Sequence, residues 1–356
     1  MIVMQSTEPA RRGSAALVHL SAIEEGLDRA GLTVRRTWAD PTHPLPVRLV
    51  ANGIQFIRAL RGADAAYLRW HVADVLPMIA LRARRVPYVL EINGPVDDVI
   101  HAHPVVRPLR PLLEALARWQ LRGATRITTV STGLAGWADR QGAGHTDPQS
   151  VQNGAFPKIQ RHRRPPEHPP YVVYFGELAD RQGVRFLLDA RRSSTWPEGL
   201  KLVVIGDGQL RPEVEAAARA GLLTSLGRLA QEGTHAIVAG AAASVSLQSP
   251  AYPRNEVMGF PFKAVESLML GVPVVGTSLS DQDRILARFP RCGVVRYGDV
   301  PALCEALTNC VRAEEAERAA IATEAGATMT WQRAGEETAE VVWDALARSG
   351  FGIAKG

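Results

Sequence analysis

The sequence predicts an α/β protein built from two doubly wound, Rossmann-like domains. Short apolar runs alternate with amphipathic segments in both halves of the chain, a pattern typical of parallel sheets with helices on both faces. Between the halves, the segment 157–170 (PKIQRHRRPPEHPP) is polar and dense in proline, and we expect it to form neither a helix nor a buried core. It therefore separates a domain over 1–156 from one over 171–327. The length of 356 residues allows two domains.

The composition excludes several classes of protein. No apolar run reaches the roughly 20 residues of a membrane-spanning helix, and the N-terminus MIVMQSTEPARRG lacks a signal-peptide core, so we expect a cytoplasmic protein. The three cysteines lack metal-ligand spacing and are expected to be reduced. Residues 1–156 contain 18 arginines, no lysine and 13 acidic residues, which suggests an anionic partner or a membrane surface. The arginines are scattered without interleaved aromatic residues, which argues against nucleic acid.

The expected elements of the first half follow from hydrophobic periodicity. They are a strand over 1–4, a helix that ends at Gly31, a strand over 32–34, a proline-rich loop over 40–48, a strand over 65–69, a helix over 73–83, a strand over 86–92, a strand over 127–131 and a helix after Ser131.

The second half repeats the pattern. It is expected to contain strands over 171–175, 202–205 and 245–248, and helices over 184–190, 212–220 and 235–243. The next stretch, 259–277 (GFPFKAVESLMLGVPVVGT), reads as a turn, a helix over 263–270 stopped by Gly271, and a buried strand over 272–275.

Polar residues cluster where the strand over 86–92 ends, and ligands of open α/β sheets bind at such strand ends. Glu91, Asn93, Asp97, Asp98 and His101 are therefore expected near a cleft. Of these, Asn93, Asp97 and Asp98 are candidates for an acceptor side, and His101 is a candidate catalytic residue that orients an acceptor or sugar hydroxyl. A solvated loop histidine is the alternative for His101.

Two further features of the first half have an ordinary alternative. Gly13, at the predicted start of a helix, would let an anion approach the backbone, but it equally fits a loop before an N-cap serine. The segment 105–122 carries four arginines among leucines and is a candidate for contact with anionic lipid, whereas a helix packed on the sheet is the commoner arrangement. Its two prolines interrupt the early periodicity.

A cation and a carboxylate begin the helix over 263–270. Lys263 and Glu266 are three residues apart and share a helix face, next to the unpaired N–H groups of the helix start. Such a group suits a phosphorylated sugar nucleotide, with Lys263 at phosphate and Glu266 at ribose hydroxyls. A solvated surface pair is the alternative.

With these residues in place, the chain resembles a GT-B glycosyltransferase of family 4. The resemblance covers nearly the whole chain, and its landmarks fall in the family's order: YLRW, YVLEINGP, ITTVS, QNGAF, YFGELADRQGVRFLLDA, LVVIGDG, GFPFKAVESLMLGVPVVGT and TMTWQRAGEETAEVVWDAL. Each landmark is weak, but their joint order is fairly specific.

The resemblance implies a GT-B fold, in which two Rossmann-like domains face a cleft and the last segment, 328–356, forms a helix that crosses back to the first domain. It implies sugar transfer from a nucleotide-sugar donor to an unidentified hydroxyl acceptor, with retention of configuration and with neither a metal nor another cofactor. The implied donor-binding residues are Gly13, Gly176, Arg181, Gly206, Asp207, Gly208, Gly227, Arg228, Gly259, Phe260, Pro261, Lys263 and Glu266.

Three positions depart from the family pattern. Glu266 matches the second of two family glutamates, but Met258 stands where the first, which contacts the donor sugar in the family, would be. Glu177 and Gln182 replace a family arginine and lysine that contact the diphosphate. Arg181, Lys263, Arg11 or Arg12 would have to compensate.

Two other interpretations stay open. The three departures also fit a catalytically inactive GT-B scaffold, and the fold equally serves other chemistry, such as sugar-nucleotide epimerisation or non-glycosidic coupling. An NAD-dependent dehydrogenase is disfavoured, since no Gly-x-Gly-x-x-Gly follows the first strand.

Overall fold

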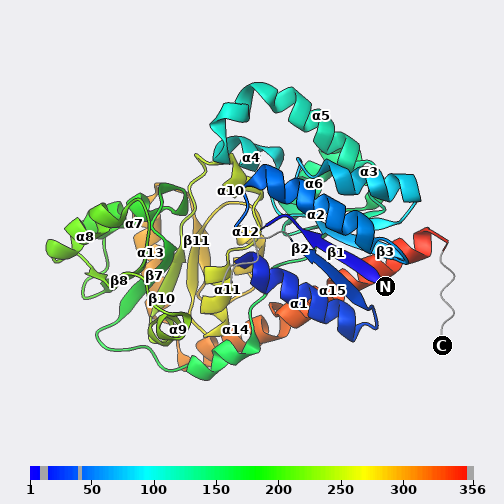
Figure 1. Ribbon diagram of the computed structural model, residues 1–356. Helices are drawn as coiled ribbons and strands as arrows, with labels where there is room; N and C mark the ends of the chain where they lie inside the picture. Colours follow the sequence, from blue (N-terminus) through cyan, green and yellow to red (C-terminus); the bar gives the residue numbers. More distant parts are fainter. Residues whose placement is uncertain (9–14, 39–41, 351–356) are drawn as a thin grey trace. The chain divides into compact units, whose positions relative to one another are not determined.

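The computed structural model describes residues 1–8, 15–38 and 42–350, which form two compact α/β units (Figure 1). The first unit comprises Met1–Asn153, Val257–Gly259 and the chain from Trp331 onward, and the second comprises Gly154–Glu256 and Phe260–Thr330. Each unit contains one six-stranded sheet in which every neighbouring pair of strands is parallel. The predicted class, two doubly wound Rossmann-like folds, is confirmed.

The sheet of the first unit has the strand order β2-β1-β3-β4-β5-β6. Its strands are β1 (Ile2–Ser6), β2 (Val34–Trp38), β3 (Ala65–Arg69), β4 (Tyr88–Ile92), β5 (Arg126–Thr129) and β6 (Gln149–Ser150). The helices are α1 (Ala15–Arg29), α2 (Leu45–Ala59), α3 (Val75–Arg84), α4 (Val96–Ala102), α5 (Arg110–Leu121), α6 (Thr132–Ala138) and α15 (Trp331–Arg348), with short turns η1 (Pro104–Leu109), η2 (Asp139–Ala143) and η3 (Gly144–Thr146).

The last helix of the chain, α15, packs against the first, α1. The contact needs two glycines: a Cβ atom added to Gly26 would lie 2.3 Å from the Cα atom of Gly335. Such an approach leaves no room for a side chain on either helix. Residues from the two ends of the sequence therefore complete one side of the first unit.

The sheet of the second unit has the order β12-β11-β10-β7-β8-β9. Its strands are β7 (Tyr171–Glu177), β8 (Lys201–Asp207), β9 (Thr224–Ser225), β10 (Ala243–Ser246), β11 (Val274–Thr277) and β12 (Gly293–Val295). The helices are α7 (Val184–Arg192), α8 (Arg211–Arg219), α9 (Gln231–Ala239), α10 (Pro253–Val257), α11 (Phe262–Met269), α12 (Gln282–Leu286), α13 (Val300–Val311) and α14 (Glu315–Thr328), with short turns η4 (Pro157–His162) and η5 (Asp180–Gln182).

Successive side chains of β7 pack into two different apolar clusters, which explains why the second sheet is covered on both faces. Val172 and Tyr174 belong to one apolar cluster, whereas Val173 and Phe175 belong to a second cluster on the opposite face. Successive side chains of a strand point to opposite faces, so a wholly apolar strand needs helices on both.

Four local expectations were wrong. The loop expected over 40–48 gives way to α2 at Leu45, because a proline is tolerated in the first turn of a helix. The segment 157–170 was expected to lack helix and buried residues, yet η4 forms and Ile159 is buried, since one short turn suffices to place a single apolar side chain in the core. The strand expected over 32–34 forms later, as β2 at 34–38, and the helix expected over 235–243 begins and ends four residues earlier, as α9.

Candidate functional site

The carboxyl ends of β7 and β8 approach each other so closely that glycine is required. Gly176 and Gly206 are paired in register, and a Cβ atom on Gly206 would lie 1.8 Å from the carbonyl oxygen of Gly176. Both have positive φ, 132° and 146°, as has Gly208 at 154°. The amide of Gly206 donates to the carbonyl of Gly227 at 2.8 Å. The structure therefore brings four of the predicted donor-binding glycines together.

Lys263 enters this strand end from the first turn of α11. Its Nζ atom lies 4.5 Å from the ring centre of Tyr174 and 3.8 Å from the place a Cβ atom would take on Gly176. The nitrogen is buried and has no hydrogen-bond partner among the described residues. Burial, and next the charge of Arg181, lower the pKa of Lys263 to about 7, against a smaller opposing effect of Glu177. A buried ammonium without a partner is costly unless a bound anion compensates it.

Two charged residues at the end of β7 and in the loop after it pair with each other. Arg181 forms an ion pair with Glu177, four residues before it. Gln182, in η5, keeps a buried side-chain oxygen without a hydrogen-bond partner in the described part of the chain. Glu177 thus engages the guanidinium that was expected to compensate for the family cations.

Glu266 lies one turn further along α11 and faces a different neighbour. Its carboxylate is 3.6 Å from Nε2 of His235, a buried residue of α9. Lys263 therefore points to β7 and Glu266 to α9, so the two charged groups of α11 diverge instead of pairing. Sequence reasoning missed His235, because it is a lone histidine in an apolar helix.

The other predicted donor residues are spread over the two units. Asp207 accepts from the amide of Gly208 at 2.9 Å, and Arg228 is exposed. Phe260 is buried, and Pro261 is the N-cap of α11. Gly259 belongs to the first unit, where a Cβ atom would lie 2.7 Å from the carbonyl oxygen of Val130. Gly13 lies outside the described residues, as do Arg11 and Arg12.

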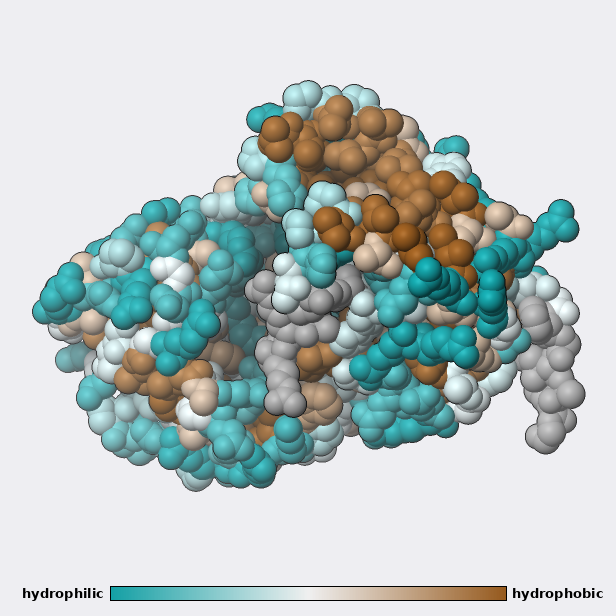
Figure 2. Space-filling view, in the orientation of Figure 1, coloured by the Kyte–Doolittle hydropathy of each residue, from teal (hydrophilic) through white to brown (hydrophobic). Residues whose placement is uncertain are grey.

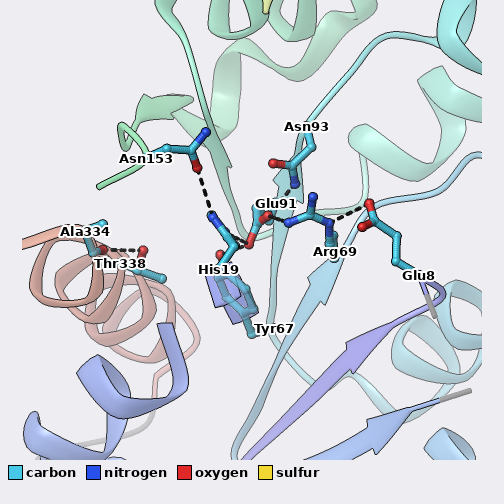
Figure 3. A network of polar contacts seen from close by, with 9 residues as sticks. All are labelled: Glu8, His19, Tyr67, Arg69, Glu91, Asn93, Asn153, Ala334 and Thr338. Atoms are coloured by element: carbon cyan, nitrogen blue, oxygen red, sulfur yellow. Dashed lines mark hydrogen bonds and ion pairs between the residues drawn. The ribbon is translucent and has the colours of Figure 1, made fainter. Parts of the chain in front are cut away.

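The first unit contains a buried polar network at the carboxyl ends of β1, β3 and β4 (Figure 3). Its centre is Glu91, whose side chain is 3% exposed. The Glu91 carboxylate accepts from Tyr67 at 2.5 Å and from Asn93, and it lies 2.8 Å from Nη1 of Arg69 and 3.0 Å from Nε2 of His19. Four neighbours, from β3, α1 and the loop after β4, therefore converge on one buried carboxylate.

The network continues outward on both sides. Arg69 donates through Nε to Glu8 at 2.8 Å, and Nδ1 of His19 lies 3.0 Å from the side-chain oxygen of Asn153 (Figure 3). The ring of Trp331, at the start of α15, meets that of His19 edge-on, with 5.2 Å between centroids. Helix α1 is thereby fixed to the sheet by a polar contact as well as by its apolar side.

The charges of the network hold Glu91 ionised. Burial alone would raise the pKa of the Glu91 carboxyl, but His19 and Arg69 keep it well below its usual range. Burial, together with the charge of Glu91, raises the pKa of Tyr67 far above its ordinary value. Tyr67 is therefore a hydrogen-bond donor at every physiological pH.

The predicted acceptor-side residues do not share one position. Asn93 belongs to the network, through its bond to Glu91. Asp97 and Asp98 lie in the first turn of α4, where Asp97 pairs with Arg110 at 2.6 Å. His101 is exposed in the last turn of the same helix. Nothing in the sequence marked His19 or Arg69 as partners of Glu91, because they come from separate elements.

Two other properties bear on the site. Within residues 1–8, 15–38 and 42–350, no group of three His, Cys, Asp or Glu side chains could hold a metal ion. None of the helices described here is long and apolar enough to cross a membrane.

Family models match both units in sequence. A model described as "Glycosyl transferase 4-like domain" matches residues 6–154, and one described as "Glycosyl transferases group 1" matches residues 169–313. Comparison with curated proteins found no significant match.

Several solved structures share the fold along nearly the whole chain. HepE from Anabaena, in complex with UDP, aligns with a TM-score of 0.70 at 14% identity, over 96% of this chain and 99% of its own. Sucrose-phosphate synthase from Thermosynechococcus elongatus aligns with a TM-score of 0.71 at 15% identity, over 98% and 100%. The lipopolysaccharide outer core galactosyltransferase WaaB, in its apo form, aligns with a TM-score of 0.70 at 12% identity, over 97% and 99%.

These identities by themselves show only a common fold. The family matches add what the fold cannot, since they lie next to each other in the sequence and together cover most of both units. The chain therefore belongs to the group 1 glycosyltransferases of the GT-B fold.

Proposed function

We propose that this protein transfers a sugar from a nucleoside-diphosphate donor to an acceptor hydroxyl, and that the donor diphosphate binds where β7, β8 and α11 meet. The observation that carries the proposal is the ammonium group of Lys263, which is buried beside the glycine backbone and has no hydrogen-bond partner in the described part of the chain. A diphosphate would satisfy that charge at a place where Gly176 lets it approach.

The remaining roles follow from position. Glu266, directed toward α9, would accept hydrogen bonds from ribose hydroxyls, while His235 beneath it would fix the carboxylate. The strand-end glycines and Asp207 would lie along the nucleotide, with Arg228 at its outer end. Asn93, Asp97, Asp98 and His101 form the proposed acceptor side, in the first unit.

The proposed chemistry retains the configuration of the sugar and uses no metal. The departing diphosphate would take the proton of the acceptor hydroxyl, so that no strong protein base is required. Lys263 would stabilise the negative charge that develops on the leaving group, and would do so effectively because its surroundings exclude water.

UDP-glucose is the first donor to test. HepE, which shares the fold at 14–15% identity, has been solved with UDP and with UDP-glucose. In this chain Met258 replaces the first family glutamate, which the resemblance assigns to sugar hydroxyls. The nucleobase and the sugar of the donor should therefore be varied separately when binding is tested.

A second candidate function is an inactive scaffold, and the Glu177–Arg181 ion pair favours it. That pair places a carboxylate at a family cation position and occupies the neighbouring arginine. Each lost charge-assisted contact weakens anion binding by about 1.5–3 kcal/mol. A nucleotide-binding measurement separates the two functions.

The test is a thermal-shift screen with UDP, GDP, ADP, TDP and CMP and their sugar conjugates. One nucleotide is expected to raise the melting temperature, because a ligand at a hundredfold excess over its dissociation constant stabilises the folded state by about 2.7 kcal/mol. Glu266→Ala should weaken the binding of that nucleotide about tenfold or more, since a charge-assisted hydrogen bond contributes about 1.5–3 kcal/mol. Glu305→Ala, at an exposed position of α13, is the matched control and should bind normally. No shift with any nucleotide would contradict the transferase and support the scaffold.

Donor binding is expected to weaken as the pH rises through 7. The pKa of Lys263 in the free protein is about 7, so its phosphate-binding ammonium form predominates below that pH and is lost above it. The dissociation constant of a nucleotide sugar should then rise with pH from about 7, by at most about tenfold per pH unit. Calorimetric titration between pH 6 and 9 measures this slope. Lys263→Met should flatten the slope, and a wild-type affinity that does not change over this pH range would contradict the proposed role of Lys263.

A further inference from the structure

The outer face of α2, in the first unit, is apolar where a helix on a protein surface is normally polar. Val47, Val50 and Ile54 are spaced i, i+3 and i+7, and all three are exposed, Val50 by 53%. Helix α3 repeats the pattern with Leu76 and Ile79, the second of which is 51% exposed. Amphipathic helices normally direct such residues at the core. Two helices here direct them outward.

The turn η1 and helix α5 extend the same apolar surface. Val105, Leu109 and Leu112 are spaced i, i+4 and i+7, with 85%, 49% and 63% of their surface exposed. This is the segment whose sequence suggested contact with anionic lipid as an alternative to packing on the sheet. Its buried residues, Ala117, Gln120 and Leu121, all fall in the second half of α5, so its first part is the exposed part.

The three pieces form one surface, which we call the apolar face. Helices α2 and α3 touch, since a Cβ atom on Gly53 would lie 2.9 Å from Cβ of Leu76. Helices α3 and α5 touch through Arg82, whose guanidinium lies 4.2 Å from the ring centre of Trp119. Figure 2 shows apolar side chains gathered over α5 and, beside it, over α2 and α3. The apolar face consists of Val47, Val50, Ile54, Leu76, Ile79, Val105, Leu109 and Leu112.

The charges around the apolar face are almost all positive. The segments Leu45–Ala59, Val75–Arg84 and Pro104–Leu121 contain seven arginines and one acidic residue, Glu114. Arg110 is engaged by Asp97 and Glu114. In contrast, Arg58, Arg107 and Arg122 are exposed and have no carboxylate partner in the described part of the chain. Arg58 therefore follows the apolar stripe of α2, and Arg107 lies between Val105 and Leu109 of the apolar face.

We propose that the apolar face docks the first unit on the surface of an anionic lipid bilayer. Aliphatic side chains would enter the boundary between headgroups and acyl chains, while the arginines meet lipid phosphates, as for amphipathic helices that lie in a membrane interface. The exposed residues are Val, Leu and Ile only, whereas the centres of protein interfaces are enriched in aromatic residues and Met. This composition, together with the mostly positive charge around the apolar face, favours lipid over a protein partner.

The test is sedimentation of the full-length protein with vesicles of phosphatidylcholine, with and without phosphatidylglycerol. Binding is expected only to the anionic vesicles, and it should weaken when the salt rises from about 0.1 M to about 1 M, because the Debye length falls from about 10 Å to about 3 Å. An arginine near an anionic membrane contributes about fivefold to binding (about 1 kcal/mol), so Arg58→Glu with Arg107→Glu should cost at least about 25-fold. Leu109→Ser with Leu112→Ser should lower binding at least about tenfold.

Matched controls come from the second unit. Arg219→Glu changes an exposed arginine of α8, and Leu226→Ser with Leu229→Ser changes two exposed leucines; all should bind vesicles like the wild type. Because every substituted side chain is exposed, melting temperatures should stay within a few degrees of the wild type, which confirms folding. Wild-type protein that ignores anionic vesicles, or equal binding by all variants, would overturn the proposal. So would a concentration-dependent dimer that Leu109→Ser with Leu112→Ser dissociates, since the apolar face would then join two copies of the chain.

Discussion

Replacing Lys263 by Met should reduce the affinity for the donor between about tenfold and about 150-fold, which corresponds to the loss of one charge-assisted contact of about 1.5–3 kcal/mol. Transfer should fall at least as much, since the same ammonium would stabilise the leaving diphosphate. Methionine has a similar length and can keep the contact with the ring of Tyr174. The substitution also removes a buried charge without a partner, so the free protein should be as stable as the wild type or more stable.

A loss of donor affinity without a loss of stability would show that Lys263 acts in binding and not in folding. Lys201→Met is the control, because Lys201 is an exposed residue that begins β8, at the opposite end of the strand from Asp207. It should change neither donor affinity nor the melting temperature. If Lys263→Met bound the donor as tightly as Lys201→Met does, the diphosphate would not lie at Lys263, and the proposed site would be wrong.

Replacing Glu91 by Gln should destabilise the first unit by about 3–5 kcal/mol, the usual cost of removing one partner from a buried ion pair. The substitution keeps the size of the side chain but leaves Arg69 and His19 facing a neutral amide in a buried place. Urea unfolding followed by tryptophan fluorescence measures the effect selectively, because six of the seven tryptophans lie in the first unit and only Trp196 lies in the second.

The pH dependence of this effect has a definite sign. The pKa of Glu91 is lower in the folded protein than its ordinary value of 4.5, so its contribution to the free energy of unfolding is complete above about that pH. As the pH falls below 4.5, the unfolded chain takes up the proton first, and the contribution is lost. The difference between wild type and Glu91→Gln should shrink over that range. Glu25→Gln removes a surface pair with Arg29 and should cost less than about 1 kcal/mol; an equal effect at both positions would show that the network contributes little.

The elements around the proposed donor site were largely predictable, because each of them is determined by its own local sequence. The helix over 263–270 and its stop at Gly271 are confirmed by α11 and by a φ of 72° at Gly271, and the strand expected over 272–275 forms two residues later, as β11. Each rests on local chemistry, namely apolar periodicity and a left-handed residue that favours glycine. Gly176 and Gly206 could be placed close together because two adjacent parallel strands end at the same edge of a sheet.

Other features depend on contacts between distant segments and could not be predicted. Glu91 was expected at a strand end, but its partner His19 comes 72 positions earlier in the chain, on α1. The divergence of Lys263 and Glu266 depends on what packs against each side of α11, which spacing alone does not determine. Of the apolar face, the sequence indicated only the segment 105–122, as one of two alternatives. The parts on α2 and α3 were missed, because an apolar periodicity does not tell whether a stripe faces the core or the solvent.

The most direct test of the central claim compares a nucleoside diphosphate with its nucleoside, on wild type and on Lys263→Met. Calorimetric titration of UDP and uridine, or of whichever pair the screen identifies, isolates the contribution of the phosphates. We expect the diphosphate to bind wild type at least about tenfold more tightly than the nucleoside, and Lys263→Met to remove most of that advantage while leaving nucleoside affinity unchanged. Equal losses for both ligands, or an undiminished preference for the diphosphate, would contradict the assignment of Lys263 to the donor phosphates.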